Sequence, residues 1–207
     1  MAESHVPLNG TRHWVRTVGD LHAATPLVVL HGGPGGFIYD FEQLTGPALE
    51  QLGPVVYYEQ RGSGRSDRPS DGEYSIPVLV DDLEQLRRHL GVGRMTLLGI
   101  SFGGELAAEY TVAYPLHVEK LILQGTGLAG PLTPSPWAAG FDAVAADNKM
   151  RTAIRTAVER SGPTAAWDVV DRATVDRFLF HKPVSAETVR ALGRRADLST
   201  PARCPPG

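Results

Sequence analysis

The segment Gly99-Ile100-Ser101-Phe102-Gly103 constrains the fold more than any other part of the chain. It follows Met95–Leu98, a short apolar run typical of a buried strand, and precedes Gly104–Tyr114, a small-residue-rich stretch typical of a helix. A strand-to-helix turn this sharp places its central residue in a strained backbone conformation, and bulky side chains two positions to either side would collide. The pattern therefore predicts a sheet that presents Ser101 above a strand end, near the first turn of a helix.

Strand and helix patterns alternate from residue 5 to about residue 126, which indicates a mostly parallel sheet covered by helices on both faces. The chain opens differently, with two strands that flank Asn9-Gly10, the strongest two-residue hairpin signal, because both turn positions need positive φ. The predicted strands are His5–Leu8, Thr11–Val18, Leu27–Leu30, Val55–Tyr58, Met95–Leu98 and Val118–Leu123, and the last of these is expected to be buried.

Two further helices are predicted between these strands. A weak helical pattern covers Phe41–Leu52. A clearer one begins after Ser75, a good N-cap residue, and Pro77 is tolerated in its first turn. Gly91 stands where a left-handed C-terminal cap is expected. The apolar residues that would share one face of this second helix are Val80, Leu83, Leu86 and Leu90.

The character of the sequence changes after residue 127. Residues 128–136 are rich in Gly, Pro, Leu, Thr and Ser, which is typical of a linker. From Trp137 to about Arg195 the pattern is amphipathic and helical, without a strand signal. The apolar residues that recur on one helical face are Met150, Ile154 and Val158. The predicted domains are a sheet-based core (1–127), a helical cap inserted after a sheet strand (128–200) and a Pro-rich tail (201–207).

Composition excludes several classes of function. A formal net charge of −3 argues against nucleic acid or an anionic membrane surface as the main partner. No run approaches the roughly 18 apolar residues of a membrane span, and the N-terminus lacks the basic and apolar regions of a secretory signal. Cys204 is the only cysteine, so no internal disulfide can form and a cytoplasmic setting is expected. No metal or organic cofactor is expected, because no cluster has ligand spacing.

The motif around Ser101 predicts nucleophilic catalysis. An acyl-transfer enzyme needs two N–H donors aimed at the oxyanion that develops during attack. One is the backbone N–H that follows the nucleophile, here Phe102. The other comes from a loop after an earlier strand, and in the Gly-rich loop His31–Gly36 we assign it to Gly33. A phosphate-binding loop is the alternative, but no phosphate-binding glycine pattern is present and Pro34 removes a donor.

Three residues near these motifs are expected to brace the site rather than to react. His31, ahead of the Gly-rich loop, is interpreted as a residue that hydrogen-bonds the loop, together with Gly32. Arg61 lies in Glu59–Ser66, a loop after the strand Val55–Tyr58, where its guanidinium group can clamp neighbouring carbonyls or carboxylates.

Three motifs occur in a fixed order and together resemble one family. They are His31-Gly32-Gly33-Pro34-Gly35-Gly36, Glu59-Gln60-Arg61-Gly62-Ser63-Gly64-Arg65-Ser66 and Gly99-Ile100-Ser101-Phe102-Gly103-Gly104. Over roughly residues 25–127 the chain resembles the prolyl aminopeptidase (proline iminopeptidase) family of α/β-hydrolases. The resemblance implies an α/β-hydrolase fold and a Ser-His-Asp enzyme that removes an N-terminal residue, often proline, so that its partner is a small peptide or small-molecule substrate. It predicts no oligomeric state.

The chain departs from the family pattern at two motifs. Glu59 stands where such families usually have Asp, and Gly103-Gly104 stands where they often have Gly-Ser. The family's helical cap supplies acidic residues that hold the free amine of the substrate, but the motifs do not align them here. The acidic residues in this part of the chain are Glu159, Asp168, Asp171, Asp176 and Glu187.

The partners that would activate Ser101 are not found in the sequence. A serine hydroxyl needs a histidine to take its proton and a carboxylate to orient that histidine, and both follow the serine in hydrolases of this fold. Only His117 and His181 follow Ser101, and neither lies in a loop after a late strand. We therefore expect the late strands, the acid and the base to be missing from these 207 residues. We expect the catalytic activity of this truncated chain to be impaired for that reason.

Three hypotheses about function stay open. The first is a serine aminopeptidase. The second is an esterase, lactonase, amidase or carbon–carbon hydrolase that uses the same site. The third is an inactive remnant or binding module with a preformed pocket. Dehalogenases and epoxide hydrolases of this fold are disfavoured, because they have Asp at the position of Ser101.

Overall fold

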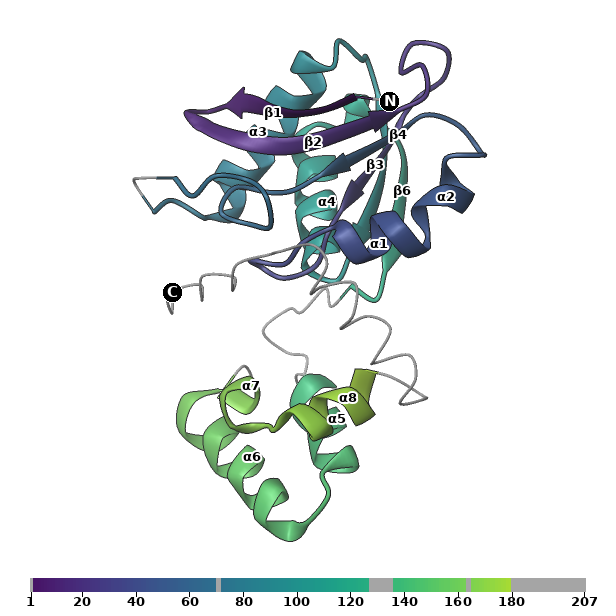
Figure 1. Cartoon of the computed structure of the whole chain (residues 1–207). Helices are drawn as coiled ribbons and strands as arrows, with labels where there is room; N and C mark the ends of the chain where they lie inside the picture. Colours follow the sequence, from purple (N-terminus) through teal and green to yellow (C-terminus); the bar gives the residue numbers. More distant parts are fainter. Residues whose placement is uncertain (1, 70–71, 127–135, 163–164, 180–207) are drawn as a thin grey trace. The chain divides into compact units, whose positions relative to one another are not determined.

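The computed structural model describes residues 2–69, 72–126, 136–162 and 165–179. The chain forms two compact units: the described residues up to 126 belong to the first, and those from 136 to 179 belong to the second. The described part of the first unit is built on a sheet, and that of the second is helical (Figure 1). The predicted linker and the Pro-rich tail lie largely or wholly outside the described residues, so the predicted domain boundaries stay a prediction.

The first unit contains a six-stranded sheet with the strand order β1-β2-β4-β3-β5-β6. The strands are β1 (Ala2–Leu8), β2 (Thr11–Val18), β3 (Leu27–Leu30), β4 (Val55–Tyr58), β5 (Met95–Ile100) and β6 (Val118–Gln124). Strands β1, β2 and β4 pair antiparallel, whereas β4, β3, β5 and β6 pair parallel. The predicted mostly parallel sheet is confirmed.

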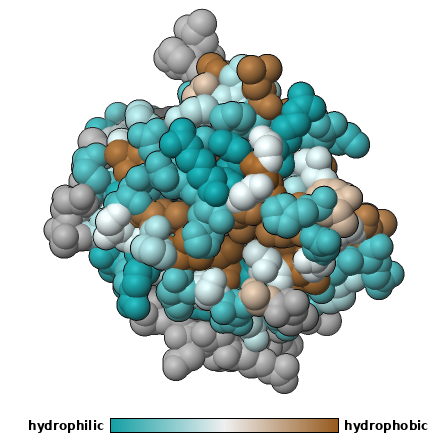
Figure 2. Space-filling view, turned by 90° about the horizontal axis from the view of Figure 1, so that it is seen from above, coloured by the Kyte–Doolittle hydropathy of each residue, from teal (hydrophilic) through white to brown (hydrophobic). Residues whose placement is uncertain are grey.

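The N-terminal hairpin has the predicted turn. Asn9 and Gly10 both have positive φ, 43° and 78°, as a tight two-residue turn requires. The first strand begins earlier than predicted, because Ala2, Glu3 and Ser4 also pair with β2. Most of β1 is exposed, and the face seen from above in Figure 2 is mainly hydrophilic, with hydrophobic residues visible between hydrophilic ones.

Helices of the first unit cover both faces of the sheet. They are α1 (Tyr39–Leu44), α2 (Gly46–Leu49), α3 (Ile76–His89) and α4 (Phe102–Ala113), with a short 3₁₀ helix at Pro115–His117. Successive strand residues point to opposite faces. Val28 and Leu30 therefore pack into one core with residues of α3 and α4, whereas Val29 packs into a second core with Ile38 and Phe41. The buried residues of both cores fix the strand ends that carry the candidate functional loops.

Of the two helices predicted between the strands, one differs in the structure and one is confirmed. The single helix predicted over Phe41–Leu52 is wrong, because the chain forms α1 and α2 with a break at Thr45. Pro47 has no backbone N–H to continue the first helix and instead stands in the first turn of the second. The α3 prediction is confirmed: Ser75 precedes it in an extended conformation and Gly91 follows with φ of 67°, although the Ser75 side chain makes no capping hydrogen bond.

The prediction that the last strand is buried is wrong. Every residue of β6 after Val118 is exposed, including the apolar run Leu121, Ile122 and Leu123. A continuous apolar run indicates burial on both faces only when elements lie on both sides of the strand. Within the residues that the structure describes, β5 is the only strand paired with β6.

The second unit is helical over its described residues, as predicted. Its helices are α5 (Pro136–Val144), α6 (Asn148–Ser161), α7 (Ala166–Val169) and α8 (Arg172–Leu179). Ile154 is buried beside Phe141, and Met150 and Val158 from the same face of α6 pack against this core. Asp147 caps α6 by accepting a hydrogen bond from the Met150 N–H at 2.8 Å. The predicted helical residues after 179 lie outside the described ranges, and no described helix is long and apolar enough to cross a membrane.

Candidate active site

Ser101 occupies the sharp turn between β5 and α4. Its backbone φ and ψ are 52° and −119°, a conformation that L-residues rarely adopt. Apart from Asn9 in the hairpin turn, it is the only described residue other than glycine with positive φ. Such strain persists only where the surrounding structure enforces it, and it gathers at functional sites. Ser101 is partly exposed and directly precedes the first helical residue, Phe102.

Backbone contacts explain the glycines on either side of Ser101. A Cβ atom on Gly99 would lie 2.5 Å from the Gly103 carbonyl oxygen, and one on Gly103 would lie 2.6 Å from the His31 carbonyl oxygen. Real Cβ atoms do not approach other atoms this closely, so both positions require glycine. A Cβ on Gly104 would overlap the Thr126 side chain, which is why a larger residue does not fit here.

The Gly-rich loop after β3 lies against the nucleophile turn. A Cβ on Gly32 would lie 3.2 Å from the Ser101 Cβ and 3.8 Å from its Oγ, so the Gly32 backbone faces the serine side chain. Gly33 has a φ of 142°, which favours glycine. Within the described residues neither the N–H of Gly33 nor that of Phe102 donates a hydrogen bond. The two N–H groups predicted as oxyanion donors are therefore free to bind a ligand oxygen.

His31 ties this loop to the next one. Its Nδ1–H donates to the Gly32 carbonyl at 2.7 Å, and its Nε2 accepts from the Gln60 N–H at 3.2 Å. The Gln60 side chain returns a hydrogen bond to the His31 carbonyl at 3.1 Å. Burial lowers the pKa of His31, which favours the neutral ring that this hydrogen-bond pattern requires. With both nitrogens engaged, His31 has no site left to accept a proton from Ser101.

Arg61 pairs with a helix rather than with the nucleophile. It is buried and donates two hydrogen bonds to Asp82 of α3, at 2.6 Å from Nε and 2.7 Å from Nη2. A third hydrogen bond joins Nη1 to the Glu73 carbonyl at 3.2 Å. This two-point geometry is the strongest form of an arginine–carboxylate pair. It attaches the Glu59–Ser66 loop to α3.

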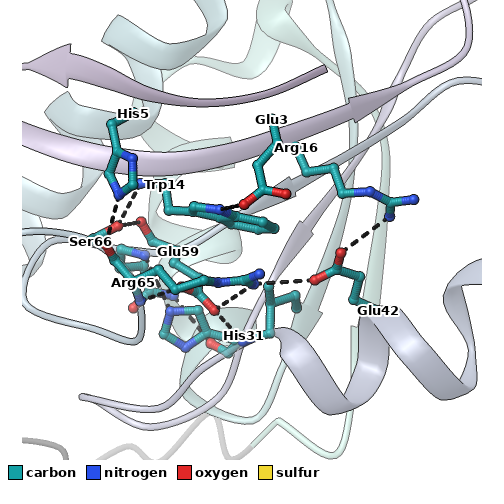
Figure 3. A network of polar contacts seen from close by, with 11 residues as sticks. Glu3, His5, Trp14, Arg16, His31, Glu42, Glu59, Arg65 and Ser66 are labelled. Atoms are coloured by element: carbon teal, nitrogen blue, oxygen red, sulfur yellow. Dashed lines mark hydrogen bonds and ion pairs between the residues drawn. The ribbon is translucent and has the colours of Figure 1, made fainter. Parts of the chain in front are cut away.

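Glu59 is the centre of a network that the sequence analysis did not identify (Figure 3). This fully buried carboxylate accepts from the Ile38 N–H at 3.0 Å and from the Arg65 N–H at 2.6 Å. The Arg65 guanidinium group adds two more hydrogen bonds to it and one to Glu42. The same guanidinium group stacks 3.2 Å from the ring centroid of Trp14. Glu59 thus joins the loop before α1 to the loop after β4.

A sequence signal for Glu59 did exist. It is the first residue after β4, and side chains at the carboxyl ends of parallel strands meet at one edge of the sheet. Gly64 also belongs to this arrangement, because a Cβ there would overlap the Glu59 carboxylate.

A cavity of about 390 Å³ opens beside the Gly-rich loop. We call it the Asp40 pocket. Its lining residues are His31, Gly32, Gly33, Gly36, Phe37, Ile38, Asp40, Phe41, Leu44, Thr45 and Ile100. Because it is lined by Gly32 and by Ile100, the residue before Ser101, it adjoins the nucleophile turn. Its volume lies within the range of small-molecule sites.

None of the described histidines makes a hydrogen bond to the Ser101 side chain. His117 lies 3.2 Å from the Glu84 carboxylate and stacks on Tyr114, and His13 contacts Tyr58. His181 lies outside the described residues, as do Glu187 and Cys204. The other acidic residues noted above, Glu159, Asp168, Asp171 and Asp176, belong to the second unit. In the described ranges no group of three or more His, Cys, Asp and Glu residues is arranged to hold a metal ion.

Known proteins resemble this chain in sequence and in fold. The family model described as "alpha/beta hydrolase fold" matches residues 25–166. The proline iminopeptidase of Lactobacillus helveticus (strain DPC 4571) is 39% identical over 127 residues, which are 60% of this chain and 43% of that protein. The proline iminopeptidase of Lactiplantibacillus plantarum is 40% identical over 124 residues, 58% of this chain and 43% of that protein.

The solved structures include a proline iminopeptidase-related protein from Thermus thermophilus. It is 30% identical to this chain, with a TM-score of 0.73, and the match covers 96% of this chain and 68% of that one. The chain spans less than half the length of the two curated relatives. The predicted resemblance to proline iminopeptidases is confirmed, and with the family model matched over residues 25–166 the chain belongs to the alpha/beta hydrolase fold family.

Proposed function

We propose that this protein is a serine hydrolase in which Ser101 is the nucleophile and the N–H groups of Gly33 and Phe102 bind the oxyanion. The observation that carries the proposal is the strained Ser101 backbone, with the Gly32 backbone facing Oγ. Attack by Oγ on a carbonyl carbon moves negative charge to the carbonyl oxygen, and two preorganised N–H donors stabilise that charge. His31 and Arg61 brace the loops through the hydrogen bonds described above.

The proposed reaction is release of N-terminal proline, or a similar residue, from a short peptide. Its support is the similarity to proline iminopeptidases, which spans 127 residues in the Lactobacillus helveticus protein. In this proposal residues 1–127 supply the nucleophile and oxyanion loop, residues 128–200 form a cap, and the enzyme works in the cytoplasm. The described residues place no base beside Ser101, so proton transfer requires a group outside them.

The decisive experiment is labelling with a fluorophosphonate probe, which reacts with activated serines. We expect labelling of the parent protein and of Ser4→Ala, a control at an exposed serine in β1, and no labelling of Ser101→Ala. Labelling that persists in Ser101→Ala would contradict the assignment of the nucleophile, and absence of labelling in the parent would support the inactive remnant instead.

Substrate class is tested separately. Proline and alanine arylamides are compared with short acyl esters at equal concentration, and the rate is measured for the parent and Ser101→Ala. Faster turnover of the proline arylamide supports the aminopeptidase. Ester turnover without any arylamide turnover would support the esterase-type hypothesis instead.

A further inference from the structure

The exposed apolar side chains of the first unit gather on one stretch of the chain. Among the described residues of this unit, seven large apolar side chains are exposed, and five of them lie between positions 112 and 123. These five are Val112, Leu116, Leu121, Ile122 and Leu123. The last three are consecutive in β6, and 37%, 46% and 40% of their surfaces are exposed. Contiguous exposed apolar residues, unlike scattered ones, mark an interaction surface.

Strand β6 is also an edge strand that lacks the features which keep edges unpaired. The sheet that the structure describes ends at β1 on one side and at β6 on the other (Figure 1). On β1, Pro7 has no N–H to donate and most of the exposed side chains are polar. Strand β6 contains no proline, and its charged residues, Glu119 and Lys120, stand only in its first half. The outer edge of β6 can therefore accept another strand.

We propose that this protein forms a dimer in which β6 pairs antiparallel with β6 of a second copy. The inference goes beyond the proposed function and does not depend on it. A two-fold axis perpendicular to the sheet pairs the outer edges of both β6 strands at once, so the assembly closes at two copies. The two six-stranded sheets then join into one continuous sheet, and each copy covers the apolar residues of the other.

Symmetry and charge select the register of this strand pair. Opposite residues lie on the same face of a sheet, and each residue has the same face in both copies, so the numbers of opposite residues differ by an even number. Centring the pair on Lys120 would oppose two like charges, and centring it on Leu121 would oppose Lys120 and Ile122. Centring it on Leu123 would oppose Ile122 and Gln124. Only the register centred on Ile122 opposes apolar residues alone, with Leu121 of each copy facing Leu123 of the other.

Sedimentation equilibrium of the full chain tests the dimer. From about 1 to 100 µM we expect a reversible shift from monomer to dimer, because a one-strand interface is smaller than that of a permanent dimer. Ile122→Lys places two positive charges opposite each other at the centre of the interface and should raise the dissociation constant at least about tenfold. Leu52→Lys is the matched control, because Leu52 is 84% exposed and lies outside β6, and it should dimerise like the parent. Urea unfolding checks that both variants fold.

A disulfide tests the register. In a Cys204→Ser background, Ile122→Cys places two cysteines directly opposite each other, where the Cα atoms of an antiparallel pair lie about 4.5 to 5.5 Å apart, within the range of a disulfide. We expect mild oxidation to link the two copies. In the same background Lys120→Cys should stay unlinked, because the Cα atoms of its two copies would lie about 14 Å apart.

A chain that stays monomeric up to about 100 µM would overturn the inference. If hydrogen exchange then showed protected amides in β6, residues of the same chain outside the described ranges would be the occupant instead. Dimerisation retained in Ile122→Lys, larger assemblies in place of a dimer, or linking through Lys120→Cys in place of Ile122→Cys would each overturn it as well. Ser101→Ala should dimerise like the parent, so failure of the proposed function leaves this test unaffected.

Discussion

His13 makes the stability of the first unit depend on pH in a defined way. The ring is fully buried, its Nδ1 accepts a hydrogen bond from the Tyr58 hydroxyl at 3.1 Å, and its Nε2 lies 3.5 Å from Asp82. Burial lowers the pKa of His13 from 6.5 to about 4, and it outweighs the opposing attraction of Asp82. The folded protein therefore keeps this ring neutral at a pH where the unfolded chain protonates it.

The sign and size of the effect follow from these two pKa values. Above pH 6.5 the ring is neutral in both states and contributes nothing to the pH dependence. Between pH 6.5 and about 4 the unfolded state binds more protons, so the free energy of unfolding falls as pH falls. One unit of pKa difference corresponds to about 1.4 kcal/mol, and going from pH 7 to pH 5 removes about 2 kcal/mol.

Urea unfolding at pH 7 and pH 5 measures this loss in the parent and in His13→Gln. The glutamine can still accept from Tyr58 but does not titrate, so its loss over this interval should be smaller by about 2 kcal/mol. His31, whose pKa burial also lowers, contributes equally to both proteins and cancels in the comparison. His22→Gln, at an exposed position, should behave like the parent. Equal losses in the parent and His13→Gln would refute the reasoning.

Two further predictions concern the loops around the site. Gly103→Ala should destabilise the protein by at least about 2 kcal/mol in urea unfolding and weaken probe labelling, because its Cβ would overlap the carbonyl oxygens of Leu30 and His31. Gly93→Ala is the matched control, because a Cβ at Gly93 enters open space. Equal stability of the two variants would contradict the contact argument. Glu59→Gln should lower the free energy of unfolding by about 3 kcal/mol at pH 7, because it removes the carboxylate that accepts two of the three hydrogen bonds donated by the Arg65 guanidinium group. Asp67→Asn, in an exposed ion pair, should change it little, and a similarly small change in Glu59→Gln would show that the network is not needed for stability.

Patterns of neighbouring residues in the sequence predicted most of the strands and helices. Burial was predicted less well, because it depends on contacts between residues that are distant in the sequence. Asn9-Gly10 fixed the hairpin because the turn depends on two neighbouring φ angles. The interpretation of β6 as buried failed because burial depends on elements that an apolar run does not itself contain. The prediction of one long helix over Phe41–Leu52 was wrong for a local reason: Pro47 has no backbone N–H with which to continue the first helix.

In the candidate site, too, local motifs could be predicted from the sequence, whereas long-range contacts could not. Three glycine-containing motifs identified Ser101 and both loops, because backbone that approaches backbone requires glycine at fixed spacing. The importance of Glu59 was not visible, since it arises from the Ile38 N–H and from Arg65 held over Trp14.

The strand order explains why the Gly-rich loop His31–Gly36 is held in place before any ligand binds. Strand β3 lies between β4 and β5, so the loop that follows it has a neighbour on either side. On one side His31 exchanges hydrogen bonds with Gln60, and on the other Gly103 packs against the His31 carbonyl. All of these contacts lie within the first unit. The geometry around Ser101 is therefore built by the sheet and its loops, so substitutions in the second unit should leave the backbone of the Gly-rich loop and of the Ser101 turn unchanged.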